Sequence, residues 1–274
     1  MVDYNADIGG DKLEILRKES LKTQFTTDLT FLGEHNGWRR GNVHVLLGAS
    51  SGGKSTLLRT CLIDALSSNN GSLKVGVVLS EESKLDFLTE LNFCGAITPL
   101  LKRLLVFSEQ DNPGEIKTQR DWFKHTKTMV EAGEIDILFF DNLTTSITYE
   151  AMTVKEQSNM AIALKRFASA MGIPVVIFAH TSAEISETYG RIINMNNIRG
   201  CKTIVNLSQF FYIMQSFYTN DARYNTLKIT KHRGQEVKDN LFQLIYEPKA
   251  RVFKESIRLK FDSLKEIFKE RNVL

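Results

Sequence analysis

The residues best suited to chemistry form a glycine-rich stretch that reads Gly-Ala-Ser-Ser-Gly-Gly-Lys-Ser-Thr over residues 48–56. A mostly apolar run, residues 43–47, precedes it, and a segment with helical character, residues 57–66, follows it. This order of strand, loop and helix is the setting of a phosphate-binding P-loop. Such a loop points successive backbone N–H groups at phosphate oxygens, and the next helix adds the positive end of its dipole. The stretch therefore predicts a nucleoside triphosphate site, and the alternative is a glycine-rich turn that binds nothing.

Each residue type in this stretch has an expected role. Gly48 and Gly53 are expected to adopt backbone conformations closed to residues with a Cβ. The Lys54 ammonium is expected to meet the β- and γ-phosphate oxygens, and the Ser55 hydroxyl to bind Mg²⁺. The ligands predicted are therefore ATP and Mg²⁺. The residues predicted to line the nucleotide are Gly48, Ser51, Gly52, Gly53, Lys54, Ser55 and Thr56.

Carboxylates close two other predicted strands. Residues 135–142 are mostly apolar and look like a Walker B segment, in which Asp141 holds Mg²⁺ directly or through water. Hydrolysis needs a carboxylate near the attacking water, but Asn142 follows Asp141 where many P-loop ATPases carry a glutamate. Glu81 ends the strand that follows the P-loop helix, and strand ends face the ligand crevice of a parallel sheet. Glu81 is the predicted general base, with a favourable position at a helix start as its alternative explanation.

The remaining pattern predicts an α/β fold. Short apolar runs at residues 74–79, 104–107, 135–142 and 175–179 alternate with helical segments, which favours a mainly parallel sheet covered by helices on both faces. Residues 209–214 and 226–231 predict strands around a turn at 219–224, and residues 241–246 and 251–253 predict a closing hairpin. The sheet is thus expected to end in an antiparallel extension. The long polar segment 181–202 shows no clear period and is expected to be a functional or mobile loop.

Three units are predicted. Residues 1–30 are expected to form an N-terminal helical segment, charged and helical up to residue 25, that docks on another subunit or packs on its own domain. Residues 31–255 are expected to form the ATPase domain. Residues 256–274 show helical spacing and predict an amphipathic C-terminal helix, although residues 257–261 also fit an alternating strand.

Composition sets wider limits. The chain has 274 residues, of which 42% are hydrophobic, enough for one large α/β domain or two small ones. The net charge of +3 is too small to identify a nucleic-acid binder. Three cysteines far apart in the sequence, Cys61, Cys94 and Cys201, indicate neither a disulfide framework nor a zinc knuckle. The start of the chain lacks the features of a signal peptide, and no apolar run reaches transmembrane length, so a soluble cytoplasmic protein without membrane contact is expected.

The order of these landmarks resembles the RecA-like fold and, more narrowly, the DnaB-type hexameric replicative helicases. Residues 32–41, which precede the glycine-rich stretch, resemble the segment before the P-loop in that family. Asp141-Asn142-Leu143 resembles the Walker B segment of the Twinkle helicase. A transporter-type ABC ATPase is excluded because the chain has no Leu-Ser-Gly-Gly-Gln signature. The resemblance covers about residues 32–253. It implies that Glu81 is the catalytic glutamate and that His180, at the end of a strand, senses the γ-phosphate; the alternative for His180 is a satisfied strand-end histidine.

Two further matches carry the functional expectation. Asn197-Ile198-Arg199-Gly200 resembles the family's central loop for single-stranded DNA, which implies that Arg199, Gly200 and Lys202 contact phosphates; the alternative is a solvent loop. Lys231-His232-Arg233 resembles the Lys-x-Arg pair that reaches a neighbouring subunit's nucleotide, and the alternative is an exposed strand with outward charges. In the possible second DNA loop, residues 144–154, Tyr149 is expected to be a packing residue.

The function expected from this resemblance is ATP-driven translocation along single-stranded DNA and duplex unwinding by a ring, most simply a hexamer. A separate primase or loader is a possible partner, and a phage or plasmid replicon is a possible source. A RecA/Rad-like recombinase or clock-type ATPase of the same fold is the nearest alternative. A nucleotide-gated DNA loader or scaffold with little hydrolysis is the alternative outside these enzymes.

Overall fold

The computed structural model describes residues 24–33, 37–68, 71–96, 98–111, 119–182, 192–218, 223–233 and 241–259. Within these residues, nine strands form one sheet in the order β11-β10-β9-β8-β3-β7-β6-β4-β5, and a separate pair joins β1 to β2. Six neighbouring strands of the large sheet are parallel. They are β3 (Val43–Gly48), β4 (Val75–Leu79), β5 (Leu104–Ser108), β6 (Ile137–Asp141), β7 (Val175–His180) and β8 (Phe210–Tyr218). The alternating sequence pattern predicted five of them, and the sixth, β8, was predicted only as a strand of the antiparallel extension.

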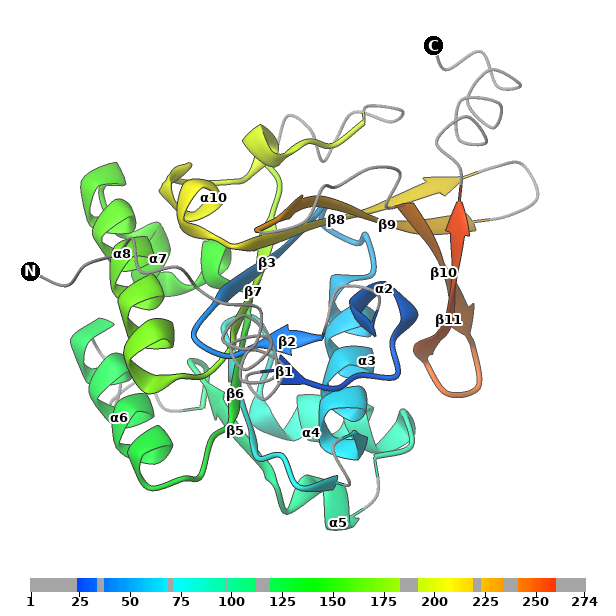
Figure 1. The fold of residues 1–274 in the computed structure, drawn as a ribbon, viewed down its shortest axis with the longest axis horizontal. Coiled ribbons are helices and arrows are strands. Elements are labelled where there is room, and N and C mark those ends of the chain that lie inside the picture. Colours follow the sequence, from blue (N-terminus) through cyan, green and yellow to red (C-terminus); the bar gives the residue numbers. More distant parts are fainter. Residues whose placement is uncertain are drawn as a thin grey trace, which may run out of the picture.

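Three antiparallel strands extend the sheet beyond β8 (Figure 1). They are β9 (Arg223–His232), β10 (Leu241–Glu247) and β11 (Val252–Leu259), so the predicted antiparallel extension is confirmed. The helix predicted to begin at residue 256 is wrong for residues 256–259, which belong to β11 and pair with β10. Ile257 lies opposite Gln243 in this pairing, and the alternating reading of the sequence was the correct one there. Residues 260–274 lie outside the described chain.

Helices cover both faces of the sheet (Figure 1). Helices α3 (Lys54–Ser67) and α4 (Lys84–Phe93) pack on one face through a cluster that includes Leu58, Phe87 and Leu46 of β3. Helices α6 (Gln119–Glu131) and α8 (Val154–Met171) cover the other face, where Val45 of β3 and Leu164 of α8 belong to one buried cluster. Successive residues of a strand point to opposite faces, so a nearly continuous apolar strand supplies both cores. The shorter helices are α2 (Thr30–Gly33), α5 (Thr98–Leu101), α7 (Ile147–Glu150) and α10 (Thr203–Leu207).

The start of the described chain packs on the same domain. Strand β1 (Gln24–Phe25) pairs antiparallel with β2 (Trp38–Arg39), so the prediction of a helix through residue 25 is wrong for its last two residues. Phe25 and Trp38 are buried in the cluster under α3. Burial of two aromatic side chains explains why this pairing replaces the helix. The predicted helix before residue 24 lies outside the described residues.

The parallel register brings several polar strand ends to one edge of the sheet. Gly48 lies opposite His180, and Leu79 lies opposite Asp141, so the loops after β3, β4, β6 and β7 meet there. The carboxyl edge of a parallel sheet is where ligands bind in α/β folds. We call the last residues of these four strands, together with the residues that follow them, the carboxyl-edge site. None of the helices in the described part of the chain has the length and apolar character needed to cross a bilayer.

Candidate functional site at the carboxyl edge of the sheet

The glycine-rich loop joins β3 to the first turn of α3. Gly53 has φ 93° and is the residue from which α3 starts, which explains why a glycine is needed there. A Cβ on Gly52 would lie 2.9 Å from the carbonyl oxygen of Ala49. The expectation for Gly48 is wrong, because Gly48 is the last residue of strand β3 and its φ is not positive. Its Cβ would instead lie 3.1 Å from Cγ of Lys54, so close approach of that side chain favours glycine there.

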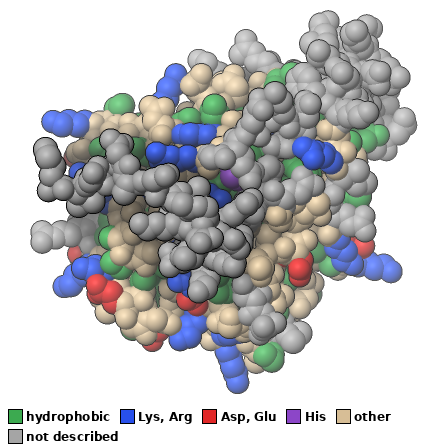
Figure 2. Space-filling model, viewed as in Figure 1, with side chains coloured by type: hydrophobic (Ala, Val, Ile, Leu, Met, Phe, Trp, Pro, Cys, Tyr) green, Lys and Arg blue, Asp and Glu red, His purple; other side chains and the backbone are tan. Residues whose placement is uncertain are grey.

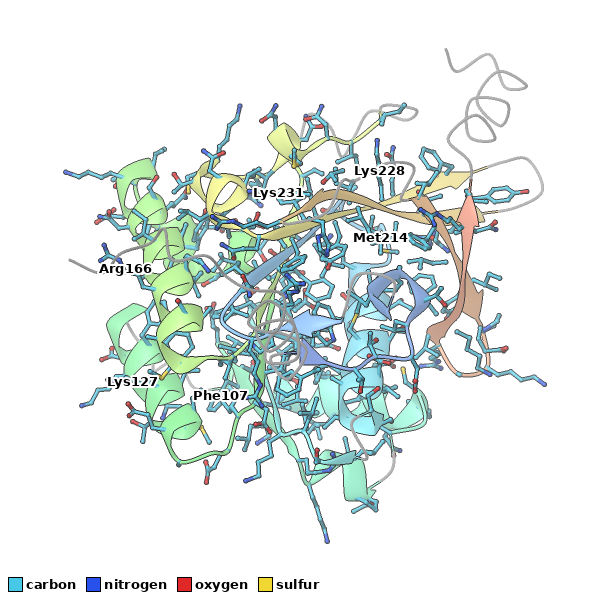
Figure 3. All side chains as sticks on the ribbon, in the orientation of Figure 1. Phe107, Lys127, Arg166, Met214, Lys228 and Lys231 are labelled. Atoms are coloured by element: carbon cyan, nitrogen blue, oxygen red, sulfur yellow. The ribbon has the colours of Figure 1, made fainter. Side chains whose placement is uncertain are left out.

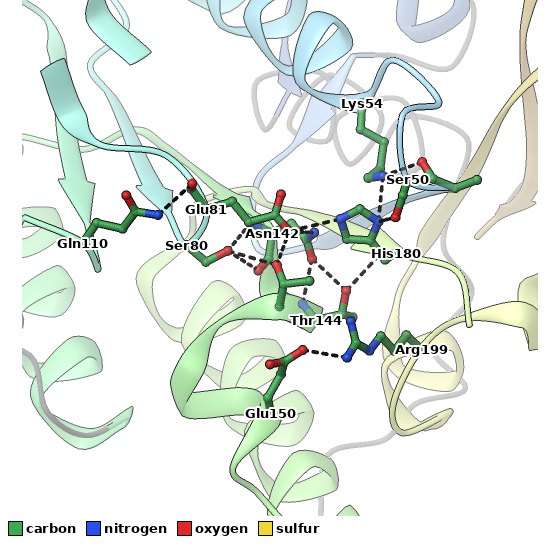
Figure 4. Close-up of polar contacts among 12 residues, drawn as sticks. Ser50, Lys54, Ser80, Glu81, Gln110, Asn142, Thr144, Glu150, His180 and Arg199 are labelled. Atoms are coloured by element: carbon green, nitrogen blue, oxygen red, sulfur yellow. Dashed lines mark hydrogen bonds and ion pairs between the residues drawn. The ribbon is translucent and has the colours of Figure 1, made fainter. Parts of the chain in front are cut away.

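The Lys54 side chain is buried under this loop (Figure 4). Its Nζ donates to the carbonyl oxygen of Ala49 at 2.7 Å and lies 3.0 Å from Nδ1 of His180. Burial lowers the pKa of Lys54 to about 8, and attraction from Asp141 and Glu81 opposes that shift. The ammonium is therefore held close to the loop by a carbonyl and an imidazole, with two carboxylates near it.

His180 joins Lys54 to Glu81. Its Nε2 lies 3.2 Å from Oε1 of Glu81, and its Nδ1 lies 3.1 Å from the Ser50 hydroxyl oxygen. A neutral imidazole with its hydrogen on Nε2 satisfies both sides, because Nδ1 then accepts from Lys54 and Nε2 donates to Glu81. The His180 backbone N–H donates to the Thr144 hydroxyl at 2.9 Å, which fixes where the strand ends.

Glu81 is half exposed but held at one oxygen. Its Oε1 accepts from the Thr145 hydroxyl at 2.6 Å and from the Asn142 side-chain amide at 3.2 Å, in addition to the contact with His180. The hydrogen bond with His180 is the largest cause that lowers the pKa of Glu81 to about 2, and burial opposes it. The group is thus an oriented carboxylate. The next residue, Glu82, forms an ion pair with Arg59 of α3 at 3.0 Å.

Asp141 and Ser55 have the chemistry that a magnesium ion needs. Burial raises the pKa of Asp141 to about 7, with attraction from Lys54 as the largest opposing effect. A nearby divalent cation would stabilise the charged form of such a carboxylate. Ser55 is exposed in the first turn of α3. Among the described residues no cluster of three or more His, Cys, Asp or Glu side chains is arranged to hold a metal. Protein Mg²⁺ sites beside a nucleotide usually use only one or two carboxylates, the rest being phosphates and waters.

The predicted DNA loop is an ordered and partly buried segment directly beside this site. The backbone N–H of Arg199 donates to the His180 carbonyl at 2.9 Å, and Ile198 forms a bridge with Thr181. Gly200 has φ 87°, and a Cβ there would lie 2.9 Å from Cε1 of Tyr149. Segment 181–202 was expected to be a functional or mobile loop, and among its described residues apolar side chains such as Ile198 are buried. Residues 183–191 lie outside the described chain.

Arg199 has a partner in its own chain. Its Nη2 lies 2.7 Å from Oε1 of Glu150 on α7, and both side chains are about half exposed (Figure 4). Lys202 is exposed immediately before α10. Tyr149 is buried and donates to Sγ of Cys201 at 3.6 Å, so the prediction that it is a packing residue is confirmed.

Lys231 and Arg233 lie at the opposite edge of the sheet. His232 pairs with Phe210, which in turn pairs with His44 near the start of β3, roughly 13 Å along the strand from Gly48. Lys231 Nζ donates to the carbonyl oxygens of Val205 and Asn206 at the end of α10, at 2.8 and 3.0 Å (Figure 3). Lys and Arg side chains gather on the surface over α10 and the end of β9 (Figure 2). The structure thus does not bring these two residues together with Lys54 of the same chain.

Sequence reasoning missed four residues that shape the carboxyl-edge site. Asn142 and Thr145 donate hydrogen bonds to the Glu81 carboxylate. In the sequence, only their closeness to Asp141 could have indicated this role. Arg223 and Ser216, from the β8–β9 pair, hydrogen-bond to carbonyls of the glycine-rich loop. These two are remote from the loop in sequence, and no motif marks them.

Comparison with models of known protein families finds no match for this chain, and comparison with curated proteins finds no similar sequence.

Proposed function

We propose that this protein is a RecA-like P-loop ATPase that binds ATP with Mg²⁺ at the carboxyl-edge site. The observation that carries the proposal is the chain of contacts Lys54–His180–Glu81 beside the first turn of α3. Binding a triphosphate needs positive charge and N–H donors, and the site offers the buried Lys54 ammonium and the N–H groups at the helix start that have no acceptor inside the helix. The imidazole and the oriented carboxylate lie beside them. Phosphoryl transfer depends mainly on such positioning and charge stabilisation.

The residues take distinct roles in this proposal. The N–H groups at the start of α3 and the Lys54 ammonium bind phosphate oxygens. Ser55 and Asp141 would hold Mg²⁺, which supplies charge neutralisation at the phosphates. Glu81 has one oxygen occupied by three donors, and its other oxygen is the candidate to orient the attacking water and accept its proton. With a pKa near 2, Glu81 is a weak base, so orientation of the water is its larger contribution. His180 links the two halves of the site.

Arg233 is the candidate to complete this site from a neighbouring copy. It is exposed at the amino edge of the sheet and lies close enough to Lys165 and Lys231 to lower the pKa of both by repulsion, after the larger effect of burial. Three neighbouring cations at an edge are favourable where they meet an anion such as a triphosphate. Lys231 is held by α10, so its expected role is to hold the end of β9 in place for Arg233.

Single-stranded DNA is the proposed polymer substrate, with the loop that carries Arg199, Gly200 and Lys202 as its contact. That loop is hydrogen-bonded to the strand end at His180, so a change at the γ-phosphate would reach it directly. Together with the resemblance of the motifs, this favours an ATP-driven ring helicase of DnaB type. A recombinase or clock-type ATPase of the same fold, or a nucleotide-gated loader, would share the nucleotide site.

The test measures phosphate release by the full chain with MgATP, with and without a single-stranded oligonucleotide. Lys54→Ala should abolish turnover, and Lys127→Ala, on the exposed face of α6, is the matched control that should not. Normal turnover by Lys54→Ala would refute the P-loop assignment. Unwinding of a forked duplex supports the helicase, binding of the oligonucleotide without unwinding favours a recombinase, and indifference to DNA favours signalling or scaffold roles.

A mixing experiment tests the contribution from the neighbour. Arg233→Ala and Lys54→Ala subunits should each be inactive alone, because an arginine supplied across an interface is worth ~10³ to 10⁵ in rate. Mixed assemblies should recover part of the turnover, since some interfaces then combine an intact Lys54 with an intact Arg233. Mixed assemblies that form but stay inactive would contradict a role for Arg233 across the interface.

A further inference from the structure

A polar network on the β8–β9 pair holds the glycine-rich loop from outside. Nη2 of Arg223 donates to the carbonyl oxygen of Ser51 at 3.0 Å. The Ser216 hydroxyl, which has one hydrogen to donate, lies 3.1 Å from the carbonyl oxygen of Gly52 and 2.8 Å from Oδ1 of Asn225. The same Arg223 group also reaches the Ser216 hydroxyl at 3.2 Å, and its Nε donates to Oδ1 of Asn225 at 3.1 Å. Arg223 therefore ties the Ser51 carbonyl to the β8–β9 pair, and Ser216 of the same pair lies within hydrogen-bond distance of the next carbonyl, that of Gly52.

These bonds bear on the direction of the N–H groups on the other side of the loop. In a planar trans peptide the C=O and N–H point in opposite directions. While Arg223 binds the Ser51 carbonyl, the Gly52 N–H of the same peptide donates to the Ala49 carbonyl at 3.1 Å and closes the turn. While Ser216 binds the Gly52 carbonyl, the Gly53 N–H of that peptide points away from the β8–β9 pair, at the start of α3.

The loop backbone also needs such support. Ser51 has φ 57°, in the left-handed region that residues other than glycine seldom adopt. The peptide that follows it carries the Arg223 bond, so the arginine stabilises this loop conformation directly. Arg223 also brings a positive charge beside Gly53, since its Nη2 would lie 3.8 Å from a Cβ there.

We propose that Arg223 and Ser216 are positioning residues of the nucleotide site, which hold the glycine-rich loop in its phosphate-binding conformation from the β8–β9 pair. This inference rests on the proposed function, because it assumes that the loop binds a triphosphate. It predicts that nucleotide affinity depends on two side chains that lie outside the motif and touch only the outer carbonyls of the loop.

The experiment measures the Kd of a fluorescent ATP analogue with Mg²⁺ for the full chain. Arg223→Gln should raise this Kd about tenfold, in line with loss of one partly exposed hydrogen bond from a charged donor. Arg223→Lys should recover most of the affinity, and Ser216→Ala should raise the Kd about threefold although it leaves the charge in place. Arg166→Gln removes an exposed arginine on α8 and should bind as the original chain does. The KM for ATP should rise with the Kd while kcat changes less than twofold.

The double variant separates positioning from independent contributions. If both residues act through the loop, Arg223→Gln with Ser216→Ala should weaken binding by less than the product of the single effects. Unfolding temperatures measured without nucleotide show whether a variant has simply lost stability.

Two outcomes would overturn the inference. One is an unchanged Kd in Arg223→Gln, whether or not its unfolding temperature falls. The other is a loss of affinity in Arg223→Gln with none in Ser216→Ala, which would indicate an effect of charge alone. If Arg223→Gln does not fold, Ser216→Ala decides, and an unchanged Kd in that variant overturns the inference. Lys54→Ala is measured in parallel. Equal binding by that variant and the original chain would refute the nucleotide site itself, whereas a loss only in Lys54→Ala refutes the role of Arg223 and Ser216 alone.

Discussion

Replacing Glu150 with glutamine should strengthen binding of single-stranded DNA. In the structure the Glu150 carboxylate pairs with the Arg199 guanidinium at 2.7 Å, and in the proposed function a DNA phosphate would have to displace it to bind the same group. The glutamine removes the competing charge and keeps nearly the same shape. The free energy of DNA binding should therefore become more favourable by the amount that the ion pair stabilises the protein without DNA.

The size of the effect follows from exposure. The two side chains are 50% and 44% exposed, so the pair lies in largely aqueous surroundings and is screened by salt. Exposed pairs of this kind are worth about 0.2–1 kcal/mol. Glu150→Gln should then tighten DNA binding by about 1.5- to 5-fold at low salt, and the gain should shrink as salt is added.

The assay is fluorescence anisotropy of a labelled oligonucleotide with the full chain and a non-hydrolysable ATP analogue, at several salt concentrations. Arg199→Gln should lower affinity and reduce the slope of log K against log salt by about 0.7, as expected for one lost phosphate contact on a single strand. Glu134→Gln, an exposed site beyond the end of α6, makes the same change in net charge and is the matched control.

The double variant decides between a specific pair and a general charge effect. In Glu150→Gln with Arg199→Gln the gain from losing Glu150 should vanish, because its partner is gone. A gain that persists in the double variant, or an equal gain in Glu134→Gln, would refute the competition between Glu150 and DNA for Arg199.

Three further predictions concern other parts of the site. Above the pKa of about 8 that burial gives Lys54, nucleotide affinity should fall as pH rises, because binding needs the charged ammonium, and titrations from pH 7 to 10 check this against a flat profile. Gly200→Ala should lower the free energy of unfolding by about 1–3 kcal/mol, since φ is 87° and the Tyr149 ring lies 2.9 Å from the new Cβ. Urea unfolding measures this loss. Gly95→Ala, at a site with a positive φ but no atom within 4 Å of the new Cβ, shows how much of it comes from backbone strain and not from the contact with Tyr149. Lys231→Met should lose about 1–2 kcal/mol of stability through the unpaired α10 carbonyls, and an unchanged urea midpoint would show that those two hydrogen bonds contribute nothing.

The sequence predicted the strands of the parallel sheet well because their signal is local. Residues 74–79 and 175–179 are short apolar runs between polar or turn residues, and each matches a strand within one residue. Parallel topology then fixes where their ends lie, and the expected neighbourhood of Glu81, Asp141 and His180 followed from it. In the structure Lys54 contacts His180, the Asn142 amide donates to Glu81, and the charges of Lys54 and Glu81 act on Asp141. This much of the site could be predicted because strand direction alone determines it.

Side-chain partners could not be predicted in the same way, because they depend on which surfaces meet. Arg199 and Lys231 were expected to be cations available to other molecules, yet one pairs with Glu150 and the other caps α10. Arg223 carried no motif, but the turn back from β8 to β9 places it on the glycine-rich loop. A sequence motif predicts where a loop or strand end lies. The side chains that hydrogen-bond to that loop, such as Arg223, come from elements remote in sequence. A cation inferred from sequence alone should accordingly be assigned to a ligand only after its intramolecular carboxylates and carbonyls have been excluded.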